Sequence, residues 1–417
     1  MPGSPWAGSA IGSTSACVCV FAARGRCFQM ELLVPAQGPE QLDMAIHFGA
    51  QAAYLAAPRW GMRAGARNFS EEELAQAVQK AHLAGVAVHL TLNTVMTDGD
   101  IDELPSFLHR VDGMGVDAAI VADLGAMALV REHAPHVALH VSTQASAMNA
   151  QAVMQYVRLG AQRIVLAREM TLAQIAELRR RVPKNVELEV FAHGSMCVAY
   201  SGRCLLSAEL MGPNRSANSG GCAQPCRWGW KLVEERSGQE IPVETDGRAS
   251  YLLSSSDLCL LEHLDKLEEA GVDAIKIEGR SKGSYYTACV TNAYRHVLDG
   301  DDPSLWMPEV EQVSHRPYST GFLFGSPSQR TYAESYARER TMVGVVRNCR
   351  QAGDAWEAEV VCRNKAASGC VLDVLSPGQP IRTMRLEVEG GLATNGESYV
   401  LRIPFAVSPL DLLCLPN

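Results

Sequence analysis

Short apolar segments alternate with helical patterns through most of the chain after Met30. Amphipathic stretches such as 71–85 and 172–182 separate these segments. Uninterrupted apolar strands with helices between them are typical of a parallel sheet that is covered by helices. The pattern therefore predicts an α/β fold. The strand candidates are 31–36, 52–57, 87–93, 118–123, 138–143, 163–167, 188–192, 251–255 and 274–279.

A closed eight-stranded barrel and an open sheet can both be built from such units. The nine candidates are one more than a barrel needs, so we expect one of them to be a short extra strand. Open doubly wound sheets usually carry a glycine-rich phosphate loop after the first strand. The corresponding turn here reads PAQGPEQ, which is not such a loop. We predict a (β/α)8 TIM-type barrel over residues 30–300, with its chemistry at the strand C-termini.

The two ends of the chain differ from this central pattern. From about 338 to 417, alternating segments separated by glycine-rich turns predict a small antiparallel β-barrel domain. The Pro- and Gly-rich residues 301–337 are interpreted as a linker. Residues 1–29 contain a short apolar run without a cleavage site, so we expect them to be disordered or to precede the natural start at Met30.

Charge and cysteine content limit the environment in which the chain works. A net charge of -9 argues against nonspecific binding of nucleic acid over the whole surface. No apolar run approaches the roughly 20 residues of a membrane-spanning helix, so we expect no membrane contact. Without an export signal, thirteen cysteines indicate a reducing compartment, which is the cytoplasm. Grouped cysteines there serve metal binding or catalysis more often than disulfides.

Four cysteines fall within a long insertion, residues 194–249, directly after the strand candidate 188–192. Their spacing is C-x6-C-x17-C-x3-C, and they are Cys197, Cys204, Cys222 and Cys226. Most zinc sites contain paired knuckles that the first half lacks, whereas an iron–sulfur cluster accepts wider spacing. Zinc and four separately buried thiols remain the alternatives. We expect the four sulfur atoms to converge even without metal.

Polar side chains at the predicted strand ends are candidates for the same site. Alternation along IKIEGR (275–280) places Lys276, Glu278 and Arg280 on one face that points into the barrel. These three side chains could form a buried, self-neutralising ion network. Alternatively, Arg280 or Arg203 could bind a dicarboxylate through the paired donors of its guanidinium group.

Further candidates lie on other segments. Gln144 follows the strand candidate 138–143, and His193 follows 188–192, where it could act as a base beside Cys197. Cys259 could be a spare metal ligand, although a core position at the start of a helix over 258–271 is the better interpretation.

Several motifs together resemble one known family. They are HGSMCVAYSGRCLLS, NSGGCAQPCRW, SSSDL, IKIEGR and YSTGFLFG. The combination is similar to the collagenase-like peptidase U-32 family, from Met30 almost to the end. The resemblance implies either proteolysis, as the family name says, or hydroxylation. Family members hydroxylate the tRNA wobble uridine in a prephenate-dependent reaction, hydroxylate a ribosomal RNA cytidine, or serve ubiquinone hydroxylation. The resemblance also implies a 4Fe-4S cluster on Cys197, Cys204, Cys222 and Cys226.

The residues favour hydroxylation over proteolysis. A protease needs an activated nucleophile or a metal-bound water, and the sequence contains no H-E-x-x-H pattern. A nucleophilic pair of Cys197 with His193 would leave three cysteines unexplained. We therefore expect an iron–sulfur enzyme that converts the wobble uridine of tRNA to 5-hydroxyuridine with prephenate or a similar small dicarboxylate. A peptidase, or hydroxylation of rRNA or a quinone precursor, is the alternative. The expected catalytic residues are His193, Lys276 and Glu278, and the expected substrate-binding residues are Arg203, Arg280 and Gln144.

Overall fold

The computed structural model describes most of the chain, with several gaps. The described residues are 29–62, 67–197, 199, 201, 203–228, 232–233, 235–238, 240–241, 256–325 and 340–416. Residues 1–28 and the strand candidate 251–255 lie outside them. Within these ranges, no helix is both long and apolar enough to cross a membrane.

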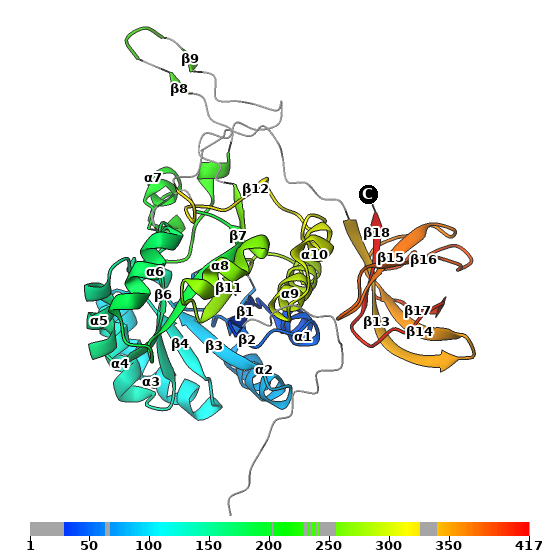
Figure 1. Ribbon diagram of the computed structural model, residues 1–417, viewed down its shortest axis with the longest axis horizontal. Coiled ribbons are helices and arrows are strands. Elements are labelled where there is room, and N and C mark those ends of the chain that lie inside the picture. Colours follow the sequence, from blue (N-terminus) through cyan, green and yellow to red (C-terminus); the bar gives the residue numbers. More distant parts are fainter. Residues whose placement is uncertain are drawn as a thin grey trace, which may run out of the picture.

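Eight parallel strands close into a barrel (Figure 1). Strand β11 pairs with β1 on one side and with β7 on the other, which completes the ring. The predicted TIM-type barrel is therefore confirmed, and the open sheet is excluded. The barrel strands are β1 (Glu31–Pro35), β2 (Ala52–Leu55), β3 (Ala87–Leu92), β4 (Ala118–Val121), β5 (Ala138–Val141), β6 (Ala161–Val165), β7 (Glu187–Ser195) and β11 (Ala274–Ile277).

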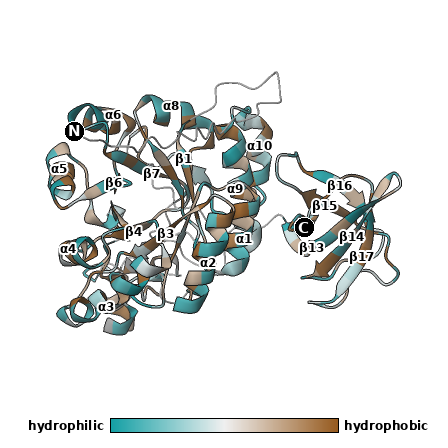
Figure 2. Ribbon diagram, turned by 90° about the horizontal axis from the view of Figure 1, so that it is seen from below, coloured by the Kyte–Doolittle hydropathy of each residue, from teal (hydrophilic) through white to brown (hydrophobic). Residues whose placement is uncertain are grey.

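Helices surround the barrel and bury their apolar faces on it. In Figure 2 the strands are largely hydrophobic, whereas the helices mix hydrophobic and hydrophilic residues. Capping boxes begin three of the helices, at Ser70, Thr97 and Thr171, where each side chain accepts a hydrogen bond from a backbone amide of the first turn. The helices are α1 (Pro39–His47), α2 (Glu71–Leu83), α3 (Asp98–Met114), α4 (Leu124–His133), α5 (Ala150–Arg158), α6 (Leu172–Arg181), α8 (Leu264–Glu269) and α9 (Ser284–Leu298).

The segment 258–271 differs from the predicted single helix. It begins as strand β10 (Asp257–Cys259), which pairs antiparallel with the end of β7. A short 3-10 helix, η5 (Leu261–His263), and α8 follow. Strand β12 (Tyr318–Ser319) extends this outer pairing. The reason is tertiary: β7 continues beyond the barrel and offers a free edge, so pairing overrides the helical pattern. The eight barrel strands match eight of the nine candidates; the ninth, 251–255, lies outside the described residues, and β10 was not among the candidates.

The C-terminal region is a curled six-stranded antiparallel sheet. Helix α10 (Pro303–Val310) precedes it, within the segment interpreted as a linker. Figure 1 shows the sheet beside α1, α9 and α10. Polar contacts join it to the barrel helices: His47 Nε2 lies 3.0 Å from Asp411 Oδ1, Arg363 Nη2 lies 3.6 Å from Glu40 Oε2, and the Gly378 amide donates to Asn292 Oδ1 at 3.4 Å. Its strands are β13 (Arg340–Ala352), β14 (Ala355–Cys362), β15 (Val371–Leu375), β16 (Arg382–Arg385), β17 (Ser398–Ile403) and β18 (Leu412–Pro416).

Candidate active site at the barrel mouth

A cavity of about 90 Å³ opens at the C-terminal ends of the barrel strands. This is the end at which barrels of this type carry their chemistry. Its lining brings together residues that are far apart in the sequence. Six of the residues expected from the sequence line it, namely Gln144, Cys197, Cys222, Lys276, Glu278 and Arg280.

Lys276 is a buried cation of the cavity and lies on β11. Its Nζ donates to Glu189 Oε1 at 3.0 Å and lies 4.5 Å from the centre of the Tyr54 ring. Burial lowers the pKa of Lys276, and the Glu189 carboxylate opposes this shift. Lys276 is therefore ion-paired with Glu189, a residue that was not part of the network of Lys276, Glu278 and Arg280 suggested by the sequence.

Arg280, the last residue of the IKIEGR segment that contains Lys276, is held in place by hydrogen bonds. Only 3% of the residue is exposed, and Nη1 donates to Thr91 Oγ1 at 2.9 Å. The Thr91 hydroxyl in turn donates to the Leu55 carbonyl at 3.1 Å. This chain of hydrogen bonds links Arg280 to strands β2 and β3, so the guanidinium group is oriented before any ligand arrives.

Gln144 and Arg203 contact each other but face different surroundings. Gln144 lies in the short 3-10 helix η1 (Thr143–Ala145), and its buried Oε1 has no hydrogen-bond partner among the described residues. Arg203 is exposed, and its Nε donates to the Gln144 carbonyl at 3.0 Å. Arg203 is outside the cavity lining. It anchors the cysteine loop to η1.

Arg168 is a cavity residue that the sequence analysis missed. Its guanidinium group lies 4.5 Å from the centre of the Phe191 ring, and Nη1 donates to the Ser195 carbonyl at 3.3 Å. Both Arg168 and Phe191 line the cavity. The sequence could have predicted this position, because Arg168 directly follows the strand candidate 163–167 and so lies at the C-terminal end of a barrel strand.

His193 does not share this cavity, contrary to expectation. It is 1% exposed, with Nδ1 3.3 Å from the Tyr294 hydroxyl and Nε2 3.4 Å from the Tyr318 hydroxyl. The pairing of β7 with β11 shifts register here: Phe191 pairs with Lys276, whereas His193 pairs with Ile277. This bulge turns His193 to the outer side of the barrel. Burial lowers its pKa to about 3, so its ring is neutral.

Gly194 allows the close approach of β7 to the end of β11. Its φ is +104°, and a Cβ at this position would lie 2.1 Å from the Glu278 carbonyl oxygen. The Tyr286 hydroxyl donates to the same oxygen at 2.7 Å. Only glycine fits this backbone conformation and spacing. The contact fixes the backbone from which Glu278 enters the cavity.

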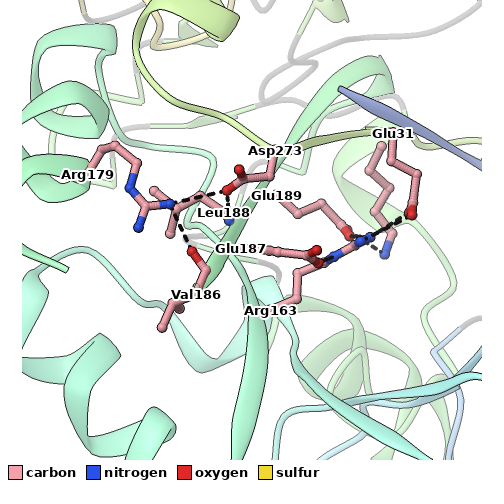
Figure 3. Close-up of polar contacts among 9 residues, drawn as sticks. Glu31, Arg163, Arg179, Val186, Glu187, Leu188, Glu189 and Asp273 are labelled. Atoms are coloured by element: carbon pink, nitrogen blue, oxygen red, sulfur yellow. Dashed lines mark hydrogen bonds and ion pairs between the residues drawn. The ribbon is translucent and has the colours of Figure 1, made fainter. Parts of the chain in front are cut away.

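A cluster of ions lies inside the barrel around Arg163 (Figure 3). Arg163 on β6 contacts three carboxylates: Glu31 at 2.6 Å, Glu187 at 2.7 Å and Glu189 at 3.3 Å. The cluster therefore joins β6 to β1 and β7. The sequence analysis missed it. The available signal was the charge within otherwise apolar strands, because an ionised side chain among buried residues requires partners.

The cysteine loop packs over the cavity through main-chain contacts. It contains helix α7 (Leu206–Met211) and the 3-10 helices η3 (Pro213–Arg215) and η4 (Pro225–Arg227). The Val95 amide donates to the Asn218 carbonyl at 2.9 Å, and Asn218 Oδ1 accepts from the Cys204 amide at 3.2 Å. The Gln224 amide donates to Cys222 Sγ at 3.3 Å. Further along the loop, β8 (Leu232–Val233) and β9 (Glu240–Ile241) pair in an antiparallel manner.

The four loop cysteines fit an iron–sulfur cluster in number and in chemistry. All four are free thiols, and Cys197 and Cys222 line the cavity. Across the described ranges, no three His, Cys, Asp or Glu side chains are grouped closely enough to hold one metal ion. The expected convergence of the sulfur atoms is therefore wrong for this structure. Thiols have no mutual attraction without a metal, and metal sites rarely form before the metal binds.

Cys259 lies away from the cavity lining. It is on β10, opposite His193, and its Sγ is 3.9 Å from the Tyr294 hydroxyl. Burial raises the pKa of its thiol to about 11, which keeps it protonated. Its position is a strand, in place of the expected helix start.

The structure assembles neither of two nucleophile patterns. Residues 279–283 match G-x-S-x-G, which the sequence analysis overlooked, but Ser281 is exposed and lies outside the cavity lining. Cys197 lines the cavity, whereas His193 contacts tyrosines on the other side of β7. A base within hydrogen-bond reach of the nucleophile is the geometric requirement for such catalysis. The pair of Cys197 and His193 does not show it.

The family follows from comparison with known sequences. The model of peptidase family U32 matches residues 37–333. This chain belongs to peptidase family U32.

Three relatives in the family span most of the chain. The tRNA hydroxylation protein P1 of Bacillus subtilis is 36% identical over 330 residues, covering 76% of this chain and 77% of that protein. An uncharacterized protease of Methanocaldococcus jannaschii is 41% identical over 305 residues, covering 71% and 73%. The tRNA hydroxylation protein P of Escherichia coli is 31% identical over 440 residues, covering 92% and 95%.

Proposed function

We propose that this chain is an iron–sulfur enzyme that hydroxylates the wobble uridine of tRNA to 5-hydroxyuridine in a prephenate-dependent reaction. One observation carries the proposal: Cys197 and Cys222 open onto the same cavity as Lys276, Glu278 and Arg280. The groups proposed to bind the metal and the substrate would thus be adjacent. Relatives named for tRNA hydroxylation support the choice of substrate. We expect the reaction to take place in the cytoplasm.

The four loop cysteines would hold the 4Fe-4S cluster. Four thiolates are the usual ligand set of such clusters. Bound there, the cluster would supply redox-active iron beside the cavity. The amide of Gln224, which already donates to Cys222 Sγ, is an example of the main-chain donors that tune cluster sulfurs.

The charges in the cavity favour a small dianion. Its described lining contains three cations, Arg168, Lys276 and Arg280, and one carboxylate, Glu278. Guanidinium groups bind carboxylates through two parallel hydrogen bonds, so Arg280 and Arg168 suit the two carboxylates of prephenate. The buried Gln144 Oε1 can accept a hydrogen bond from a ligand hydroxyl. Lys276 and Glu278 are then the groups placed to move protons.

The RNA would reach this site from the open end of the barrel. The wobble base belongs to a single-stranded loop, so it can enter a pocket without the cost of breaking a base pair. This is consistent with a chain whose overall charge is negative, because a local contact with one loop does not require a basic surface.

A deletion strain with plasmid-borne variants tests the proposal. We expect loss of 5-hydroxyuridine derivatives from the wobble position, measured by mass spectrometry of tRNA nucleosides. Wild-type plasmid should restore them, and Cys197→Ala or Cys222→Ala should not. Unchanged tRNA in a strain without a redundant pathway would overturn the assignment. Cleavage of gelatin by purified, iron-free protein would instead support the peptidase.

A further inference from the structure

Glu189 is a fully buried carboxylate between two cations inside the barrel. Its Oε1 accepts a hydrogen bond from Lys276 on β11 at 3.0 Å, and its Oε2 lies 3.3 Å from Arg163 Nη1 on β6. Figure 3 shows Glu189 close to Arg163. One carboxylate therefore joins the cavity cation Lys276 to the ion cluster around Arg163.

The other surroundings of Lys276 suit a charged ammonium group. Its Nζ lies 4.5 Å from the centre of the Tyr54 ring and 5.7 Å from that of Phe191, distances at which ring faces attract cations. The titratable groups that act on it from neighbouring strands are His89 (β3), His140 (β5), Arg163 (β6), Glu189 (β7) and Glu278, which follows β11.

The two histidines in this set do not add charge. Their rings pack edge to face with centroids 4.8 Å apart, and burial lowers the pKa of both, to about 3 for His89. Arg163 repels Lys276. The Glu189 carboxylate, in direct contact, is the strongest group that favours the protonated form.

We propose that Glu189 is a positioning residue for the reaction in the cavity: it keeps Lys276 protonated and holds its ammonium group toward an anionic ligand. Arg163 fixes the Glu189 carboxylate from β6. This inference rests on the proposed function, since the anionic ligand is the dicarboxylate assigned there. Glu189 acts through Lys276 and lies outside the cavity lining itself.

Glu187 provides a matched control on the same strand. It also contacts Arg163, at 2.7 Å, but its side chain is 47% exposed, and the carboxylate that Lys276 contacts is Glu189. A purely structural role in the ion cluster would make Glu187→Gln and Glu189→Gln similar. A positioning role affects Lys276 only in Glu189→Gln.

The first measurement is prephenate affinity, by calorimetry from pH 6 to 9. Wild-type and Glu187→Gln proteins are expected to bind alike. Glu189→Gln is expected to bind at least tenfold more weakly, with the loss growing as pH rises, because Lys276 loses its proton at a lower pH. Equal affinities in Glu189→Gln and Glu187→Gln across this range would overturn the inference.

The second measurement needs no ligand and separates the two proposals. Where Lys276 is neutral in the folded protein and protonated in the unfolded chain, the folding equilibrium constant rises about tenfold per pH unit. Urea unfolding should show this rise beginning at lower pH in Glu189→Gln than in wild-type or Glu187→Gln protein. If the shift appears while wild-type protein fails to bind prephenate, the ligand assignment fails and the role of Glu189 stands.

If Glu189→Gln does not fold, the variant Glu189→Asp can still test the positioning role. Glu189→Asp retains the charge but withdraws the carboxylate by one methylene. It should show the wild-type pH dependence of unfolding and weaker prephenate binding, because the ammonium group moves with its partner. Wild-type affinity in Glu189→Asp would contradict positioning.

Discussion

The two halves of the cavity are built in different ways. Its floor is Lys276, and the ions Glu189 and Arg163 lie beneath that residue. All three side chains belong to strands, and each of these charges has a partner within 3.3 Å. Its rim comes from the cysteine loop, where the four thiols are not drawn into one metal-holding group. The ion pairs of the floor are formed by the chain alone, whereas the rim would be completed by the proposed cluster.

This difference follows from how each part obtains its stability. Strand positions are fixed by the ladder of the barrel, so side chains on neighbouring strands meet whether or not a ligand is present. A loop has no such ladder, and in the proposed holoprotein metal–thiolate bonds would supply part of the folding free energy of the cysteine loop. We therefore expect changes in the rim to abolish cofactor binding without unfolding the barrel, and changes in the floor to alter ligand affinity and proton uptake.

The largest effect is expected from the rim. Cys222→Ala should remove the cluster, because three thiolates leave one iron without its protein ligand. Anaerobically prepared wild-type protein should contain about four iron and four sulfide per chain, and the variant should contain almost none. Wobble hydroxylation should be lost with it. The circular dichroism spectrum of the barrel should remain, and collapse of the whole fold would contradict the separation of rim and floor.

Arg280 tests the cavity wall next to the floor. Arg280→Lys keeps the charge but loses the paired donors and the hydrogen bond to Thr91. Prephenate affinity should fall about 10- to 100-fold, since hydrogen bonds to charged groups contribute about 1.5–3 kcal/mol each. Calorimetry measures this, and iron content should not change. Arg203→Lys is the control, because Arg203 lies outside the cavity lining and should leave the affinity near the wild-type value.

Substitution of His193, which lies outside the cavity, should have a smaller effect, on the pH dependence of the free energy of unfolding. Its pKa in the folded protein is about 3, below the ordinary value of 6.5, so the unfolded chain binds one more proton between these values. Stability is therefore lost as pH falls below about 6.5, by up to about 1.4 kcal/mol per pH unit for this one group. Urea unfolding of His193→Gln between pH 5 and 7 should show a slope that is smaller by up to this amount. An unchanged slope would mean that His193 is charged in the folded protein.

The sequence predicted the barrel and much of the cavity because both depend on regular alternation. Apolar strands at regular intervals sufficed for the fold, and alternation along 275–280 placed Lys276, Glu278 and Arg280 correctly at the mouth. His193 was misplaced because one bulge reverses the faces of a strand, and a bulge has no clear sequence signal. Glu189 was missed because its partners Arg163 and Lys276 lie 26 and 87 residues away along the chain, and only the pairing of β7 with β6 and with β11 brings them together.

The smallest effect is expected for Cys259, and it distinguishes a loop ligand from a buried thiol. Cys259→Ala should retain about four iron per chain, because this residue pairs with His193 on the outer side of β7 and does not line the cavity. The substitution should lower only the free energy of unfolding, by about 1 kcal/mol, because the side chain is small and partly buried. Cys226→Ala is the matched comparison, since it changes the same atoms within the loop and should lose the iron. If Cys259→Ala loses iron and Cys226→Ala retains it, the fourth ligand comes from β10, and the rim must then reach around the end of β7 to the outer strand.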